Sequence, residues 1–360
     1  MNETRRELLR LGAGAIAAAG VAGCTGSLGS GASDAGGEES EGTSATASFF
    51  TLYDFVRNVG GDAFAVENAV PAGQHGHGWE PQSDITADVV ERDAFVHLGI
   101  EGFQRWADEI VAEIEANHDD VTLIPVAEGI ELSEYGDRGH ESDHHDGEED
   151  GNHDGDEEHG HDDHEHGGEG DHQEEDGRDH GDYDPHLWVD PVRARQAVEN
   201  VRGGLVEADE ENAETYEENA AAYLDELEAL DRRFEEELAG RERDVVVVAG
   251  HDSYGYLAER YDFEIHTPQG VSPDAEASPG DIAETVDLVE REGIEYVLYD
   301  HFEGDTLART IVEEAETATD VARLSPAESV TEEWEAEGLD YVGQMEEINL
   351  PSLRRALGAE

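Results

Sequence analysis

Hydrophobic and polar positions follow two patterns along this chain, one typical of strands and one typical of helices. Between Ala45 and about Gly136, short apolar runs typical of strands are separated by segments in which apolar residues recur every three or four positions. A second stretch of the same kind begins at Asp244 and runs to Leu357. Strands that alternate with helices are typical of α/β units with parallel sheets. The pattern therefore predicts two similar α/β lobes with mainly parallel sheets.

The bounds of the predicted elements follow from where each strand-like or helix-like pattern begins and ends. In the first lobe the predicted strands are residues 47–52, 63–70, 94–98 and 121–126, and the predicted helices are residues 54–60, 84–91 and 103–117. In the second lobe the predicted strands are residues 244–249, 263–267, 296–299 and 321–324, and the predicted helices are residues 282–292, 307–318 and 341–357.

A long segment between the two lobes, residues 211–238, contains neither Gly nor Pro. Its apolar residues recur at helical spacing, as at Tyr216, Tyr223 and Leu230. At 1.5 Å per residue, such a helix is about 40 Å long. We therefore expect one long rigid helix to join the lobes.

The N-terminus has the pattern of an export signal. Arg5 and Arg6 precede a short apolar run over residues 11–22, and Cys24 follows it. The run is too short to cross a bilayer as a helix. The Arg pair resembles a twin-arginine signal, and the residues before Cys24 resemble a lipobox, so we expect lipidation of Cys24. An uncleaved membrane anchor is the alternative.

Composition shifts complete the predicted organisation. It comprises a signal peptide (1–24), a flexible linker (25–45), an N-terminal lobe (46–210) that contains an insertion (137–182), the linking helix (211–239) and a C-terminal lobe (240–360). The insertion consists almost entirely of Asp, Glu, Gly and His, with ten His between His140 and His180. It lacks the apolar residues of a core, so we expect it to be disordered. Its many imidazoles favour metal contact over a merely solubilising acidic loop.

The charge balance restricts the partners and the environment. The chain has 92 acidic and 21 basic residues, a formal net charge of −71, and every basic residue is Arg. This charge disfavours binding to nucleic acid. The acid excess extends through the predicted helices and strands, which indicates a folded protein adapted to high salt, where repulsion is screened. A protein from dilute surroundings with acidic tails is the alternative.

Three short segments place a His at the mouth of a predicted strand. They are residues 71–81, 184–191 and 249–256. Ligands of open α/β sheets bind at the carboxyl ends of strands, so we expect these segments to converge in the cleft between the lobes. The only cysteine is Cys24, which excludes a disulfide within the chain and a Cys-based zinc site. Three neutral imidazoles suit Zn²⁺, although a single His beside an aromatic residue is more often structural.

At these residues the chain resembles the metal-binding proteins of zinc and manganese ABC transporters, the ZnuA/TroA-like, cluster A-I or adhesin-type family. The resemblance runs from about residue 45 to 357, interrupted by the acidic insertion, and the segment 270–279 matches another family signature. It implies that the metal ligands are His77, which precedes an aromatic-Glu-Pro segment, His186 and His251. His75 is then an extra His, and Ser253 departs from the usual family pattern.

The resemblance also implies a metal and a role. His251 and the His-rich loop are markers of the zinc members, and water or Glu328 is expected to complete the tetrahedron. The implied protein is of haloarchaeal type, a monomer anchored by lipid at the extracellular face of the membrane. It captures Zn²⁺, delivers it to an ABC transporter permease and is not an enzyme. A manganese-specific relative, a zinc-dependent hydrolase and a surface metal buffer without a transporter are the alternatives.

Overall fold

The computed structural model describes residues 43–76, 79–134, 183–269 and 277–359. These ranges all belong to one compact unit, Gly42–Glu360. The expected signal peptide and lipidation site, His77 and the insertion 137–182 lie outside the described residues, as do residues 25–42 of the expected linker. Among the described helices, none is both long and apolar enough to span a membrane.

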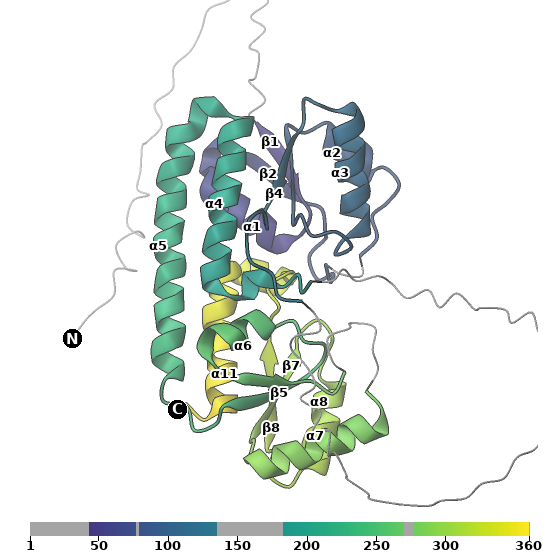
Figure 1. Ribbon diagram of the computed structural model, residues 1–360, viewed down its shortest axis with the longest axis vertical. Helices are drawn as coiled ribbons and strands as arrows, with labels where there is room; N and C mark the ends of the chain where they lie inside the picture. Colours follow the sequence, from purple (N-terminus) through teal and green to yellow (C-terminus); the bar gives the residue numbers. More distant parts are fainter. Residues whose placement is uncertain (1–42, 77–78, 135–182, 270–276, 360) are drawn as a thin grey trace, which may run out of the picture. The chain divides into compact units, whose positions relative to one another are not determined.

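The first lobe is built on a four-stranded parallel sheet with strand order β2-β1-β3-β4 (Figure 1). Its strands are β1 (Ser44–Ala47), β2 (Ala65–Asn68), β3 (Ala94–His97) and β4 (Thr122–Pro125), and its helices are α1 (Phe50–Gly60), α2 (Ile85–Val90) and α3 (Arg105–Asn117). All four residues of β3 are buried. That burial is expected of a central parallel strand with both faces covered.

The second lobe repeats this topology. Its four parallel strands have the order β6-β5-β7-β8, so the strands of the two lobes correspond one to one in chain order. The strands are β5 (Val245–Ala249), β6 (Glu264–His266), β7 (Tyr296–Asp300) and β8 (Asp320–Leu324), and the helices are α6 (Gly255–Tyr261), α7 (Pro279–Glu292), α8 (Thr306–Glu314) and α9 (Glu332–Glu337). The prediction of two parallel α/β lobes is confirmed.

In chain order, the described residues between β4 and β5 form two α-helices, not one. The predicted long helix is α5 (Ala213–Leu238), whose 26 residues bury a stripe that includes Tyr216, Leu227 and Phe234. At 1.5 Å per residue it is about 39 Å long. The second helix, α4 (Pro191–Ala208), packs against α5 and was not predicted (Figure 1). Asp190 caps it through Val192 N, with Pro191 in the first turn.

The C-terminal segment contacts the first lobe at Tyr341, where it begins, while α11 (Leu350–Leu357) packs against the strands of the second lobe. The segment is helical over α10 (Tyr341–Gln344), a π turn (Met345–Asn349) and α11, so the single helix predicted over 341–357 contains a π turn. The ring centroid of Tyr341 lies 5.2 Å from that of Phe55 in α1. The Tyr341 hydroxyl donates to the carbonyl of Trp188 at 2.6 Å. These contacts join the C-terminal segment to α1 and to the turn that precedes α4.

One predicted strand is wrong. The apolar run 47–52 was assigned to a strand, but the strand is β1, which ends at Ala47, and α1 begins at Phe50. β1 also starts at Ser44, inside the range assigned to the linker. The run is apolar on both sides of the turn because strand and helix are both buried, so periodicity could not separate them. Tertiary packing, not local pattern, decides this boundary.

A buried carboxylate on α1 makes stability depend on pH. Asp54 is 2% exposed and accepts from Tyr223, Asn58 and Tyr341. Burial, followed by the nearby charge of Asp340, raises the pKa of Asp54 from 3.8 to about 7. The folded protein therefore holds a proton at this site that the unfolded chain has released between about pH 4 and pH 7. This group's contribution to stability falls as pH rises through that window.

Replacing Asp54 with Asn is expected to remove this dependence. The variant should gain stability relative to the parent at pH 8, by at most about 4 kcal/mol less the weakened hydrogen bonds, and should gain much less at pH 5. Denaturant unfolding in high salt at both pH values measures the difference. Asp287→Asn, an exposed acid on α7, is the control. An equal gain for Asp54→Asn at the two pH values would contradict the assignment.

Candidate metal centre

Loops at the carboxyl ends of four strands surround the candidate site. His75 follows β2, His251 follows β5 directly, Glu303 follows β7 and Glu328 follows β8. Parallel strands present their carboxyl ends at one edge of a sheet, where α/β proteins bind ligands. The two lobes therefore contribute their corresponding edges to one place.

Three imidazole rings meet at this place. The ring centroid of His251 lies 5.5 Å from that of His186 and 5.9 Å from that of His75. Two imidazoles on one tetrahedral Zn²⁺, each with a Zn–N distance of about 2.0–2.1 Å, have centroids roughly 5 Å apart. Small side-chain rotations would therefore bring His186 and His251 onto one zinc ion.

The first loop supplies His75 in the described part of the chain. The His75 side chain is 22% exposed and its Nδ1 pairs with Glu328. Gly76 N donates to Glu328 Oε1 at 3.2 Å, and its carbonyl accepts from Gln104 at 3.4 Å. His77, which the family register favours as a ligand, lies outside the described residues. The loop thus has two candidate imidazoles, two residues apart.

His186 is fully buried and is held by Asp184. Its Nδ1 lies 2.7 Å from Asp184 Oδ1, and its backbone N–H donates to the same oxygen at 2.9 Å. A carboxylate on one ring nitrogen fixes the orientation of a metal-binding imidazole. The prediction that His186 lies at the end of a strand is wrong. His186 immediately precedes a short 3-10 turn (Leu187–Val189) and α4, because the insertion separates it from β4.

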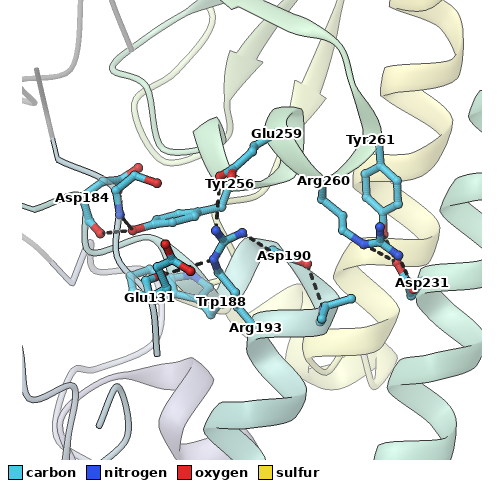
Figure 2. A network of polar contacts seen from close by, with 12 residues as sticks. Glu131, Asp184, Trp188, Asp190, Arg193, Asp231, Tyr256, Glu259, Arg260 and Tyr261 are labelled. Atoms are coloured by element: carbon cyan, nitrogen blue, oxygen red, sulfur yellow. Dashed lines mark hydrogen bonds and ion pairs between the residues drawn. The ribbon is translucent and has the colours of Figure 1, made fainter. Parts of the chain in front are cut away.

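A network from the second lobe positions the His186 segment (Figure 2). The Tyr256 hydroxyl, on α6, accepts from Ser133 N at 2.9 Å and donates to the Asp184 carbonyl at 2.8 Å. Arg193 lies over the Tyr256 ring, 4.5 Å from its centroid, and pairs with Asp190 at 2.8 Å. Tyr256 thereby joins the helix that follows His251 to the segment that carries His186.

His251 is held at both ring nitrogens. Its Nδ1 hydrogen-bonds to Glu303, and its Nε2 lies 2.7 Å from Ser253 Oγ. Both His251 and Ser253 are buried. Glu303 corresponds in kind to Asp184, since each carboxylate orients one imidazole. The Ser253 contact is an additional one.

Carboxylates dominate the electrostatics of the site. Burial by itself lowers the pKa of His75, but Glu328 and then Asp300 and Glu303 outweigh it and raise the pKa to about 9. The same balance, led by burial and opposed chiefly by Glu303, raises the pKa of His251. Burial raises the pKa of Asp300 to about 6. An environment that favours positive charge this strongly suits a divalent cation.

Glu328 is held in place by its backbone. Its side chain is completely buried. The preceding residue, Ala327, has a φ of 57°, a left-handed conformation that is uncommon for a residue with a Cβ. The Thr51 hydroxyl donates to the Ala327 carbonyl, and Ser325 Oγ accepts from Ala327 N at 3.1 Å. Such local strain is typical of functional sites.

The imidazoles of the site are hydrogen-bonded to neighbouring carboxylates in the structure. Within residues 43–76, 79–134, 183–269 and 277–359, no three His, Cys, Asp or Glu side chains are already arranged to hold a metal ion. A metal ion bound by the His251 ring would have to replace a hydrogen bond at one of its nitrogens. No sequence pattern singled out Asp300 or Glu303, which lie among many acidic residues. The family resemblance implied that His75 is an extra His and not a ligand.

The fold and this site define a class: two-lobed α/β proteins with a His- and carboxylate-lined centre at the edges of both sheets. The chain belongs to the family described as zinc-uptake complex component A, periplasmic (ZnuA), whose sequence profile matches residues 46–356. This match confirms the ZnuA family that the sequence resembles, while the cluster A-I subtype stays a prediction. The family consists of transporter binding proteins, not enzymes.

Named relatives and solved structures agree with this assignment. The zinc-binding lipoprotein AdcA of Streptococcus pneumoniae is 32% identical over 320 residues, 87% of this chain and 55% of AdcA. The chain thus spans about half the length of that relative. The high-affinity zinc uptake system protein ZnuA of Bacillus subtilis is 27% identical over 89% of this chain and 90% of its own.

Among solved structures, the chain is similar to the Zn(II)-bound ZnuA-like domain of Streptococcus pneumoniae AdcA. The TM-score is 0.65 with 28% sequence identity, and the match covers 88% of this chain and 99% of that domain.

Proposed function

We propose that this protein captures Zn²⁺ outside the cell and delivers it to the permease of an ABC transporter. The observation that carries the proposal is the convergence of His186 and His251, from separate segments of the chain, at a ring-centroid distance of 5.5 Å beside buried carboxylates. The relatives' names, zinc-binding lipoprotein and zinc uptake protein, support zinc as the cargo.

The proposed ligands are His77, His186 and His251, with Glu328 as the fourth. Imidazole nitrogens and one carboxylate oxygen are a ligand set that zinc accepts in tetrahedral geometry. Manganese prefers sites richer in carboxylate and carbonyl oxygen, so three imidazoles favour zinc. Among the described residues, the pairing of Glu328 with His75 supports a place for this carboxylate in the site.

The proposal includes a membrane anchor, a salt-rich habitat and a role for the insertion. Diacylglyceryl on Cys24 would hold the protein, as a monomer, at the extracellular face, since one acyl chain anchors only marginally. The net charge of −71 without any Lys supports a haloarchaeal type. The ten His of 137–182 would hold further zinc ions weakly and raise their concentration beside the tight site.

Native mass spectrometry of protein extracted from membranes in high salt tests these statements together. We expect one zinc ion that survives a competing chelator, several that do not, and a diacylglyceryl mass on Cys24. Deleting residues 137–182 should remove the weak ions and leave the tight one, because preorganised ligands bind more tightly than a chain that must be ordered.

Three results would count against the proposal. A parent protein that retains no zinc against the chelator would remove the assigned cargo, and retention of manganese in its place would favour the manganese alternative. Loss of the tight ion on deletion of the insertion would move a primary ligand into that segment. A Cys24 without lipid would remove the anchor and leave the zinc assignment standing.

A further inference from the structure

The Ser253 hydroxyl lies where a metal ion would have to bind His251. Ser253 Oγ is 2.7 Å from His251 Nε2, while Glu303 occupies Nδ1. Ser253 is 0% exposed and its backbone N–H donates to the carbonyl of His251 at 3.1 Å, so a tight turn fixes the hydroxyl beside the ring. The hydroxyl is therefore shielded from solvent.

The contact engages Nε2 in either protonation state of the ring. In neutral His251, Glu303 accepts the Nδ1 proton, so the Nε2 lone pair accepts from the Ser253 hydroxyl. In protonated His251, the Nε2 proton is donated to Ser253 Oγ. Zinc coordinates through a lone pair on a neutral imidazole. Coordination at Nε2 therefore requires the hydrogen bond to Ser253 to break first.

We propose that Ser253 is an internal competitor of the metal, a positioning residue that holds the metal-free His251 ring in place and weakens zinc binding. The inference rests on the proposed function and adds a residue that tunes affinity. When zinc binds, the Zn–Nε2 bond forms, the Ser253–Nε2 hydrogen bond breaks and the hydroxyl keeps its proton. A protonated ring also releases its Nε2 proton to solvent.

A competitor of this kind favours release of the metal. A binding protein that delivers its cargo must give it up, and a hydroxyl ready to replace the metal at one ligand lowers the free-energy cost of the empty site. Asp184 holds His186 at Nδ1 as Glu303 holds His251. The Ser253 hydroxyl adds a contact at Nε2 of His251, so we assign the tuning role to the His251 side.

The test is zinc affinity of Ser253→Ala, measured by competition with a chromophoric chelator in high salt on the full chain. Removing one neutral hydrogen bond from the metal-free state should tighten zinc binding about two- to tenfold. Ser253→Thr, which keeps the hydroxyl, should bind like the parent. Ser352→Ala is the control. It also removes a buried hydroxyl, which donates to the Arg323 carbonyl at 2.6 Å, and should leave zinc affinity unchanged.

A second measurement does not depend on zinc. Nitrogen-15 NMR of the metal-free protein should show the His251 Nε2 signal, assigned by its loss in His251→Ala, shifted in Ser253→Ala and unchanged in Ser352→Ala. A merely structural role for Ser253 predicts weaker zinc binding in Ser253→Ala, because a loosened site loses preorganisation.

Unchanged or weaker affinity in Ser253→Ala, or an unshifted Nε2 signal, would overturn the inference. These outcomes are distinguishable from a failure of the proposed function. If the parent binds no zinc tightly, the function is wrong, whereas a parent that binds tightly beside a Ser253→Ala that binds no better refutes only the competitor.

Discussion

Replacing His251 with Ala is expected to weaken zinc binding by on the order of 100-fold, since a structural zinc site worth about 10–16 kcal/mol draws roughly 3 kcal/mol from each of four ligands. His186→Ala should have a similar effect. Each variant also removes the imidazole ring that Glu303 or Asp184 orients. The measurement is chelator competition in high salt with each purified variant.

The first loop needs a comparison between two variants. We expect His77→Ala to lose as much affinity as His251→Ala, and His75→Ala to lose less, because His75 is expected to act through Glu328, with which it pairs. The reverse order would make His75 the ligand and place His77 outside the set.

His118→Ala is the matched control for these variants. His118 is part-exposed, and its Nε2 lies 3.7 Å from Glu113 at the end of α3. It also removes one imidazole from the chain, so nonspecific effects of losing a His should appear there. If all the site variants hold zinc as tightly as the parent, the assigned centre is wrong.

The architecture was predictable because its signals are periodic. Both stretches of alternating strands and helices became parallel sheets, and residues 213–238 of the expected long segment form one helix. Two features were not predictable for a physical reason. The turn at Ser48 lies in a mainly apolar run whose residues are all buried, and the apolar stripe of α4 (Ala194, Val201 and Leu205) is diluted by Gly203 and Gly204. Gly204 is required there because a Cβ would lie 2.6 Å from Ile124 Cγ1.

The site was predictable in its outline and not in its contacts. His251 and Glu328 follow strands, so topology alone brings them to the same edge. Glu303 approaches His251 from 52 residues away, and no spacing rule marks one carboxylate among 92 acidic residues. The Tyr256 network likewise joins Ser133 to a residue 123 positions on. Such long-range contacts depend on packing that a single sequence does not state.

Lowering the salt concentration is expected to unfold the protein without any mutation. The net charge of −71 repels itself, and the Debye length grows from about 3 Å at 1 M to about 10 Å at 0.1 M salt. Folded domains are stable by only about 5–15 kcal/mol, and we expect the unscreened repulsion to exceed this margin. We expect a cooperative loss of circular dichroism between molar and 0.1 M KCl, at a lower KCl concentration when zinc is bound.

The acidic face of α5 offers a variant that separates charge screening from other effects of salt. Glu214, Glu217 and Glu218 are exposed and lie three and four positions apart, a spacing at which like charges repel on a helix. Changing all three to Gln should shift the unfolding midpoint to lower KCl, because less repulsion remains to be screened. The same substitutions should have little effect at molar KCl, where short-range packing dominates. If sulfate and KCl both shift the unfolding midpoint but the three substitutions do not, salt acts through hydrophobic burial and not through charge screening. A protein that is equally stable at 0.1 M and at molar KCl would refute salt adaptation altogether.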